Sequence, residues 1–458
     1  MPLRFPMMKR LLLISPVAKS SLVGKDFNFR LPVLGLLKVA ALTPPNWQVG
    51  ILDEKVEPLD LEHEADLVGI TAMTTTAPRA YEIADQFRRR GVRVVMGGMH
   101  VSALPDEALQ HCDSVVVGEA EELWAGLLGD FERQSLQPVY RHQNGFPSLQ
   151  NLPLPNWELY REKRYLPVHF VETTRGCPLD CEFCAVTTAF GGRYRNRPPD
   201  EVIAELRSLR PFEGRFILKN CVFFVDDNII GNRAHARDLL PRLAEFKLKW
   251  FSHASMNIAK DLEILQLCRQ SGCIGLFIGF ETFSAESLRA VGKRINHPGE
   301  YLEVARRIHD HGIGIDASFV FGLDADDEGA FDRTLEFVER AKIEVPYYSI
   351  LTPYPGTRLH HRLTEEKRLL TNDWSLYDAS HVVYQPKTMT ADKLLAGYYR
   401  VLGESFSLGS IFKRLWGTTA YKQFFYPMNF GFRHSARALC RAYHQGRMNL
   451  SPGDRVQD

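Results

Sequence analysis

The segment Thr174-Arg-Gly-Cys177-Pro-Leu-Asp-Cys181-Glu-Phe-Cys184 decides how the rest of the chain is interpreted. Three residues separate its first two cysteines, and two residues separate the second pair. A loop of this length can curl three thiolates round one cubane iron–sulfur cluster and leave the fourth iron open for a ligand from outside the protein. A zinc site that lacks its fourth ligand and buried structural cysteines are the alternatives. The spacing favours the cluster, with Cys177, Cys181 and Cys184 as its ligands.

Strands and helices alternate through the part of the chain that carries this loop. Six apolar stretches are predicted as strands: Val168–Thr173, Val222–Asp227, Lys249–Ser255, Gly275–Glu281, Gly314–Gly322 and Tyr347–Thr352. Six strands with helices between them predict a partial (β/α)6 barrel of the TIM type. Barrel active sites are assembled at the carboxyl ends of the strands. Polar residues stand at those predicted ends: Asp226, Asp227, Ser255, Glu281 and Thr352.

A second alternating series precedes the barrel. Its predicted strands are Leu11–Ser15, Val49–Asp53, Leu67–Ala72, Val92–Met96 and Ser114–Val117. Their apolar continuity indicates strands buried on both faces, and a helical pattern such as Ala80–Arg90 lies between them. The series therefore predicts an open, doubly wound, Rossmann-like sheet. Gly97, Gly98 and Gly118 directly follow strands, where ligands bind in such sheets.

Proline-rich and helical segments complete the domain organisation. We predict a first domain over residues 1–140, a linker over 141–165, the barrel over 166–385 and a helical domain over 386–458. The helical part carries the patterns Asp392–Phe406, Ile411–Trp416 and Ser435–Tyr443, and it mixes aromatic residues with Lys and Arg. This mixture suits an amphiphilic partner such as a lipid, a membrane surface or a tetrapyrrole, although packing of a helical cap over the barrel is the favoured explanation.

The composition excludes several classes of protein. The chain of 458 residues carries 56 Lys and Arg against 55 Asp and Glu, so its formal charge of +1 attracts neither nucleic acid nor anionic lipid as a whole. No apolar run approaches the ~20 residues that a membrane-spanning helix needs, which favours a cytoplasmic protein with reduced thiols. The eight cysteines cluster unevenly and do not resemble a disulfide framework.

The cysteine loop after the first barrel strand resembles the signature of the radical S-adenosylmethionine (SAM) superfamily. Further motifs resemble the strands of its cobalamin-binding, class B methylase-like subclass: Phe223-Phe-Val-Asp-Asp-Asn228, Ile278-Gly-Phe-Glu-Thr282, Ser318-Phe-Val-Phe-Gly322 and Tyr354-Pro-Gly-Thr357. The resemblance implies a 4Fe–4S cluster whose open iron binds SAM, and whose reduction produces a 5′-deoxyadenosyl radical. It also implies SAM contacts from Phe183, Asp226, Asp227, Ser255 and Glu281. The alternative for Phe183 is a simple core phenylalanine. For Asp226 and Asp227 it is capping at the strand end, and for Glu281 it is a structural ion pair.

The N-terminal sheet resembles the domain of that subclass which holds cobalamin against the barrel. The patterns Gly97-Gly-Met-His100-Val-Ser and Gly118-Glu-Ala-Glu121 carry this resemblance. It implies cobalamin contacts from Thr71, Thr74, Thr75, Thr76, Gly97, Gly98, His100, Gly118 and Glu119. No Asp-x-His-x-x-Gly motif occurs, so His-off binding is implied and His100 is not expected to ligate cobalt. The Ala72–Arg79 loop is expected near the lower face of the cobalt. A nucleotide pocket and a sheet that has lost its cofactor are the alternatives.

The resemblance implies C-methylation of an unactivated carbon in a small-molecule, lipid or tetrapyrrole substrate, by way of the 5′-deoxyadenosyl radical and methylcobalamin. An oxidative cyclase or a rearrangement enzyme without methyl transfer, and a non-catalytic sensor that binds the cluster or cobalamin, are the alternatives. The expected partners are a small or amphiphilic substrate and an electron donor such as flavodoxin or ferredoxin. Peripheral membrane contact is a further expectation, whereas no basic stripe points to nucleic acid.

Overall fold

The computed structural model describes residues 8–18, 30–143, 145–209 and 220–450. The chain divides into two compact units, Met1–Leu166 and Pro167–Asp458, and each is described by itself. Within the described ranges, no helix is long and apolar enough to cross a membrane.

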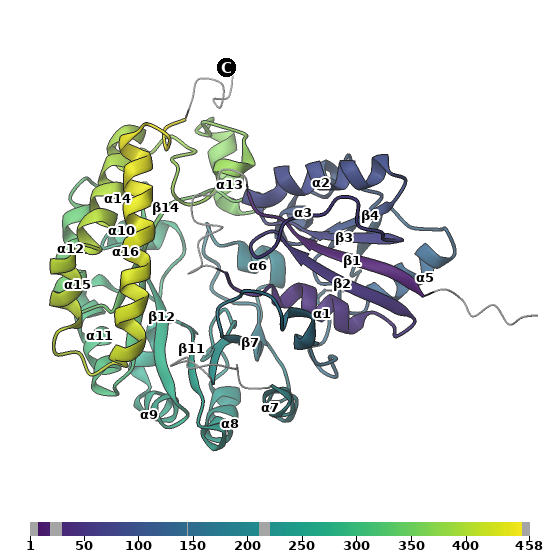
Figure 1. Ribbon diagram of the computed structural model, residues 1–458. Coiled ribbons are helices and arrows are strands. Elements are labelled where there is room, and N and C mark those ends of the chain that lie inside the picture. The colour runs from purple at the N-terminus through teal and green to yellow at the C-terminus, as the bar shows by residue number, and fades with distance from the viewer. Residues whose placement is uncertain (1–7, 19–29, 144, 210–219, 451–458) are drawn as a thin grey trace, which may run out of the picture. The chain divides into compact units, whose positions relative to one another are not determined.

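The first unit is built on one sheet of six parallel strands in the order β2-β1-β3-β4-β5-β6 (Figure 1). Its strands are β1 (Lys9–Ser15), β2 (Trp47–Asp53), β3 (Leu67–Thr71), β4 (Arg93–Gly97), β5 (Ser114–Val117) and β6 (Val139–Arg141). The strand order reverses between β1 and β3. In open sheets of this kind, ligands bind at the carboxyl ends of the strands beside this reversal.

Helices cover both faces of this sheet, as the unbroken apolar strands predict. The helices are α1 (Leu34–Leu42), α2 (Ala77–Arg89), α3 (Met99–Ala103), α4 (Pro105–Ala108) and α5 (Trp124–Glu132). Leu37 of α1 and Leu127 of α5 pack in one core cluster, and Ile83 and Phe87 of α2 pack in the other. The predicted linker also carries a helical turn, Trp157–Tyr160, whose Tyr160 is buried in the cluster of α1.

The second unit contains a partial barrel of six parallel strands in the order β14-β13-β12-β11-β10-β7 (Figure 1). Its strands are β7 (His169–Val171), β10 (Cys221–Phe224), β11 (Lys249–Ala254), β12 (Cys273–Glu281), β13 (Gly314–Phe321) and β14 (Val345–Ile350). A short antiparallel pair stands beside them, β8 (Thr174–Arg175) and β9 (Arg195–Asn196). The predicted doubly wound sheet, partial barrel and helical tail are all confirmed.

Helices connect the barrel strands and then form the tail. They are α6 (Ala185–Phe190), α7 (Pro199–Ser208), α8 (Arg233–Leu243), α9 (Leu262–Gln270), α10 (Ala285–Ala290), α11 (Tyr301–Asp310), α12 (Ala330–Arg340), α13 (Arg358–Glu365), α14 (Ala391–Ser405), α15 (Leu408–Leu415) and α16 (Lys422–His444). Alternate strand residues such as Ile278 and Phe319 pack outward in one core with helices α11 and α12. The residues between them face the interior of the barrel.

The helix α16 begins earlier than the sequence pattern predicted, at Lys422 instead of Ser435. Its added turns carry Phe425, a fully buried residue whose ring lies against Gly275 of β12 and Gly314 of β13. A side chain on either glycine would collide with that ring or press on it. Phe425 therefore packs at the amino ends of these strands, opposite to the cysteine loop, and this contact stabilises the helix in spite of Pro427.

Candidate functional site

The cysteine loop begins with a tight turn that only glycine accommodates. Gly176 has a left-handed backbone with φ +89°, and a Cβ at this position would collide with the carbonyl oxygen of Arg193. Within the loop, the Cys184 N–H donates to the Cys181 carbonyl at 3.1 Å. Farther along the chain, the backbone of Gly292 passes close to the carbonyl of Asp180. These contacts fix the loop at the carboxyl end of the barrel.

The three thiols of the loop lie close enough to influence one another. Burial raises the pKa of Cys181 to about 11, and the neighbouring Cys184 and Cys177 add to the rise. Burial also raises the pKa of Cys184. In both cases the charge of Lys293 opposes the shift. Because only the thiolate binds a metal, a buried cation beside these thiols favours the form that can act as a ligand.

Among the residues that the structure describes, no three His, Cys, Asp or Glu side chains gather round one ion position. In a cubane, each cysteine binds a different iron. The assignment of the three thiols to a cluster therefore rests on their spacing in the loop.

Lys293 is a residue at the site that the sequence motifs did not reveal. Its ammonium lies 2.7 Å from Glu281 Oε1, at the carboxyl end of β12. Burial lowers the pKa of Lys293, but the charges of Glu281 and Cys181 outweigh this effect and leave the pKa raised. A Cβ on Gly279 would collide with the Glu281 carboxylate, so the glycine makes room for the pair. The pair sets an ammonium and a carboxylate side by side near the cysteine loop, and the ammonium acts on Cys181 more strongly than the carboxylate does.

The double variant K293M/E281Q is expected to make the reduction potential of the cluster more negative. Reduction adds negative charge to the cluster, and the charge of Lys293 acts on Cys181 more strongly than the opposing charge of Glu281 does, so loss of both removes a net stabilisation on the order of tens of millivolts. Replacing both partners avoids leaving Glu281 as a buried, unpaired carboxylate. A redox titration monitored by electron paramagnetic resonance (EPR) checks the shift. The control is K393M, which replaces an exposed lysine of α14. An unchanged potential would show that the charge of Lys293 has no effect on the reduction potential of the cluster.

The predicted carboxylates at the end of β10 have different environments. Asp226 is fully buried and accepts hydrogen bonds from the Thr173 N–H at 2.6 Å, the Thr174 N–H at 3.0 Å and the Thr173 hydroxyl. Asp227 is only half-buried and accepts one from the Gly176 N–H at 3.0 Å. Burial raises the pKa of Asp226 to about 7 and that of Asp227 to about 6. Asp226 thus ties β10 to the start of the loop, while Asp227 presents the more accessible carboxylate.

Asn228 connects several parts of the site. Its amide nitrogen donates to Tyr194 Oη at 2.8 Å and to Ser255 Oγ at 3.2 Å, and its oxygen accepts from the Ser255 N–H at 3.1 Å. Tyr194 Oη in turn lies 4.0 Å from Cys177 Sγ. The structure therefore links Ser255 to the cysteine loop through two residues, Asn228 and Tyr194, that were not among the predicted contacts. Phe183, the predicted adenine contact, is half-buried against the barrel core.

In the first unit, the predicted cobalamin contacts gather at the carboxyl ends of three neighbouring strands. Thr71 ends β3 and is followed by Thr74, Thr75 and Thr76; Gly97 ends β4 and is followed by Gly98 and His100; Gly118 and Glu119 follow β5. Gly118 has φ +84°, and a Cβ there would meet no atom within 4 Å. Met73, in the loop after β3, has 52 % of its surface exposed. Open space beside backbone and an exposed apolar side chain fit the broad face of a large ligand.

Other members of this set have structural contacts. Gly98 has φ +102°, and a Cβ there would come within 2.7 Å of the Ala72 carbonyl, so this glycine permits close packing of β3 and β4. His100 is fully buried and its Nε2 lies 3.2 Å from Glu107 Oε1. This histidine is therefore held inside the core beside Glu107.

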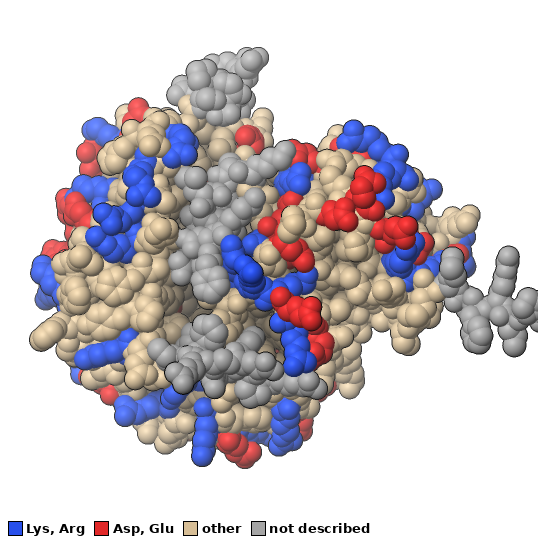
Figure 2. Space-filling model, viewed as in Figure 1, with Lys and Arg blue, Asp and Glu red and all other residues tan. Residues whose placement is uncertain are grey.

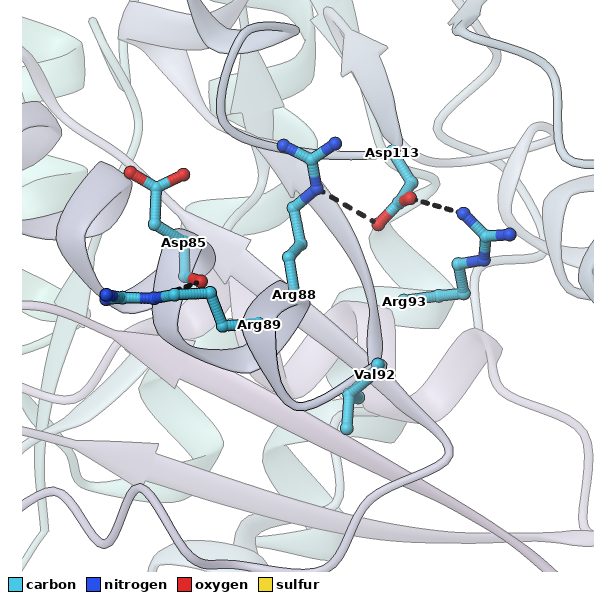
Figure 3. A pocket seen from close by; sticks show the side chains of 7 residues that line it. Asp85, Arg88, Arg89, Val92, Arg93 and Asp113 are labelled. Carbon is cyan, nitrogen blue, oxygen red and sulfur yellow. Dashed lines mark hydrogen bonds and ion pairs between the residues drawn. The ribbon is translucent and has the colours of Figure 1, made fainter.

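A surface pocket of the first unit lies away from these strand ends (Figure 3). It is lined by Arg88 and Arg93, which both form ion pairs with Asp113, and by Arg89, which bonds to the Asp85 carbonyl. It surrounds the connection between α2 and β4, at the amino end of that strand. Because its cations are already paired, we assign it no ligand.

Comparison with known proteins defines the class to which this architecture belongs. Residues 171–338 match the family description "Radical SAM superfamily", and residues 20–128 match "B12 binding domain". Residues 357–435 match a domain of unknown function. A barrel with a cysteine loop at the carboxyl ends of its strands, preceded by a B12-binding sheet, defines a cobalamin-binding radical SAM protein.

Individual relatives narrow the class. The chain is 33% identical to the bacteriochlorophyllide d C-12(1)-methyltransferase of Chlorobaculum tepidum over 417 residues, which cover 89% of this chain and 90% of that protein. It is 32% identical to the hopanoid C-2 methylase of Rhodopseudomonas palustris over 75% of this chain and 66% of that protein. The methyltransferase TsrM from Kitasatospora setae, solved with cobalamin and a 4Fe–4S cluster, has the same fold with a TM-score of 0.65 and 16% identity, over 96% of this chain and 100% of that chain.

The chain belongs to the cobalamin-dependent radical SAM methyltransferases. It is an enzyme whose cofactors are a 4Fe–4S cluster, S-adenosylmethionine and cobalamin. The predicted family, enzyme class and cofactors are confirmed. Because both relatives named above transfer methyl groups to carbon, a cyclase, a rearrangement enzyme and a sensor are not favoured.

Proposed function

We propose that this enzyme methylates an unactivated carbon on the ring system of a largely apolar small molecule. The similarity to a chlorophyllide methyltransferase along nearly the whole of both chains carries this proposal. The similarity to a hopanoid methylase supports an apolar ring system more generally. When bound, the reduced cluster supplies the electron that cleaves SAM, and cobalamin supplies the methyl group.

The residues of the barrel would divide the remaining tasks. Cys177, Cys181 and Cys184 would hold the cluster, and Phe183 would lie against the adenine of SAM. Asp227, Ser255 and Glu281 would bind its polar groups, because they stand at the strand ends and carry free acceptor capacity. We assign Asp226 a positioning role, since its oxygens already accept three hydrogen bonds from Thr173 and Thr174.

In the first unit, we propose that the strand ends after β3, β4 and β5 hold cobalamin. Gly118 would let the backbone approach the ligand, and Thr75 and Thr76 would bond its amide rim. The exposed Met73 would contact its lower face. We retain residues 1–140 for this domain, 141–165 for the linker, 166–385 for the radical SAM barrel and 386–458 for the helical domain. We also propose that the enzyme receives electrons from a donor such as flavodoxin or ferredoxin. We place it in the cytoplasm, where the environment is reducing.

The fate of a labelled methyl group tests the proposed function. The reconstituted enzyme receives SAM with a trideuterated methyl group, a reductant, and either a chlorophyllide-type pigment or a hopanoid. We expect mass spectrometry to find the intact trideuteromethyl group on a carbon of one of these substrates. A product that lacks the label would contradict methyl transfer from SAM.

We further propose that the helical tail docks on an anionic membrane surface, where apolar substrates dissolve. Leu408 and Phe412 on α15 and Trp416 directly after it recur every four residues, and each has between 46% and 76% of its surface exposed. From Ser405 to Leu450 the chain carries seven Lys and Arg and no Asp or Glu. Figure 2 shows blue side chains prominent round this part of the second unit. An apolar ridge bordered by cations fits the interface of an anionic bilayer.

Vesicle binding checks the docking surface. The variant F412S/W416S is expected to bind vesicles that contain anionic lipid at least about tenfold more weakly than the wild type. It lacks the two aromatic side chains that would become buried in the bilayer interface. The variant F146S, which alters an exposed phenylalanine of the first unit, is the control. Equal binding of all three proteins, or binding that ignores lipid charge, would rule out the surface.

A further inference from the structure

The inner face of the barrel carries a continuous belt of aromatic side chains. Ring centroids follow one another at 4.7 Å from Phe223 to Phe251, 5.0 Å from His253 to Phe277, 5.0 Å from Phe277 to Tyr347 and 5.1 Å from Tyr347 to Phe432. Phe223 also lies 5.3 Å from His253, and this contact links the first pair to the rest of the series. The belt therefore runs from β10 across β14 to α16.

The members of the belt on β10, β11, β12 and β14 remain half-buried, although their neighbours along the strands are fully buried. Leu276 and Ile278, on either side of Phe277, pack outward in the core. The rings of the belt on these strands therefore line the interior of the barrel, and part of each ring stays accessible. Aromatic faces stack on flat conjugated rings at about 0.5–1.5 kcal/mol for each pair beyond the area buried.

One carboxylic acid lies in the same inner row. Asp316 of β13 is in register with Phe277 on one side and Val345 on the other, and paired residues of parallel strands point to the same face. Its side chain is near Tyr347, because the charge of Asp316 raises the pKa of that phenol in addition to the effect of burial. Asp316 therefore stands within the aromatic belt.

The carboxyl of Asp316 has no partner in the part of the chain that the structure describes. The residue is 5% exposed, and its Oδ1 is buried without a hydrogen bond. No hydrogen bond or ion pair of the described residues involves this side chain. Burial raises the pKa of Asp316 well above its ordinary value, and the charge of Glu344 adds to the rise. A carboxyl buried beside aromatic rings without a cation or a hydrogen-bond donor favours its neutral form, and that form has an O–H to donate.

A buried polar group without a partner costs about 1–3 kcal/mol, whereas a leucine in the same row would pack without this cost. A polar group at this place in the belt therefore lowers the stability of the folded barrel, but it keeps a hydrogen-bond donor on the inner surface. A ligand that brings an acceptor to Asp316 would remove the cost on binding. The aromatic neighbours limit that ligand to one with a flat face and a polar group at its edge.

We infer that the inner row of the barrel selects a planar, conjugated substrate with a carbonyl at its edge, and that Asp316 donates the hydrogen bond that fixes this carbonyl. The inference deepens the proposed function, on which it rests, by choosing a conjugated macrocycle over a saturated polycyclic hydrocarbon. Asp316 is in this role a specificity-determining residue.

Binding measured without turnover tests this assignment. The probes are pheophorbide a, a planar chlorin with a ring ketone, its analogue in which that ketone is reduced to a methylene, and diploptene, a hydrocarbon with five saturated rings. Binding to the reconstituted holoenzyme is followed by quenching of protein fluorescence. We expect the wild type to bind pheophorbide a at least tenfold more tightly than either of the other two.

Variants separate a ligand contact from a structural role. D316L is expected to bind pheophorbide a at least tenfold more weakly than the wild type and to bind the ketone-free analogue unchanged. D316N, which keeps a donor of similar shape, should stay within threefold of the wild type. D310L, on the exposed surface of α11, is the control for both probes. D316L should also melt no lower than the wild type, since it loses an unpaired buried acid.

Several results would overturn the inference. The first is an absence of pheophorbide a binding by the wild type. The second is binding of pheophorbide a by D316L as tight as by the wild type, and the third is tighter binding of diploptene than of pheophorbide a. Each outcome is distinct from a failure of the proposed function, because binding requires no SAM cleavage. If the wild type binds the chlorin through Asp316 but adds no trideuteromethyl group to any substrate, methyl transfer fails and the binding assignment stands.

Discussion

Cys184→Ala is expected to abolish both the iron–sulfur cluster and the cleavage of SAM. The loop supplies three thiolates to a cluster that keeps one iron open, so the loss of one leaves two ligands for four irons. The remaining thiols, Cys177 and Cys181, cannot enclose the cubane. We expect iron and sulfide content to fall to background, and the yield of 5′-deoxyadenosine to fall at least about a hundredfold.

A matched variant distinguishes this effect from general damage. Cys440 lies on α16 of the same unit and donates to the Tyr399 carbonyl at 3.5 Å, far along the chain from the loop. Cys440→Ala should keep its iron, its EPR signal after reduction and its yield of 5′-deoxyadenosine. Retention of a full cluster by the Cys184 variant, or an equal loss in both variants, would show that the ligand assignment is wrong.

Asp226→Ala is expected to cost about 3 kcal/mol of unfolding free energy and to reduce cluster loading. The carboxyl is fully buried and accepts from two N–H groups and one hydroxyl, so alanine would leave all three donors without a partner. Those donors belong to Thr173 and Thr174, which directly precede the cysteine loop. Loss of the contact therefore affects both the stability of the barrel and the position of the loop.

Denaturant unfolding of the protein and its iron content check this prediction together. Asp227→Ala is the control for stability, because the half-buried Asp227 accepts a single hydrogen bond, from Gly176, and its loss should cost about 1 kcal/mol. If Asp226→Ala proves as stable as Asp227→Ala, the three hydrogen bonds of Asp226 do not support the barrel as we describe.

The sequence pattern predicted the fold class because its signals are local. Unbroken apolar strands such as Leu67–Thr71 indicate a sheet covered on both faces, and the structure has this arrangement. The ends of elements were less predictable. The predicted strand Val222–Asp227 ends at Phe224. Beyond it, the Asp226 carboxylate accepts hydrogen bonds from the backbone N–H groups of Thr173 and Thr174. Those partners lie more than fifty positions away in the chain.

The loop cysteines were predictable as candidates because their spacing is a local motif, and their role as ligands stays a prediction. Lys293, Tyr194 and Asn228 were not predictable, since they come together at the site only through the barrel. No spacing marks Lys293 as the partner of Glu281, which stands at an irregular position of β12 with φ +69°. Only the pairing of strands across the barrel shows that Asp316 lies beside Phe277 and Tyr347.

The count of SAM-derived products in a single reaction tests the central claim most directly. Methyl transfer by a radical route consumes one SAM as methyl donor and one as radical source, so the reconstituted enzyme is given reductant and the substrate that accepts the label. We predict S-adenosylhomocysteine, 5′-deoxyadenosine and methylated product in equal amounts. Formation of 5′-deoxyadenosine with an unmethylated product, or of methylated product without 5′-deoxyadenosine, would contradict the claim.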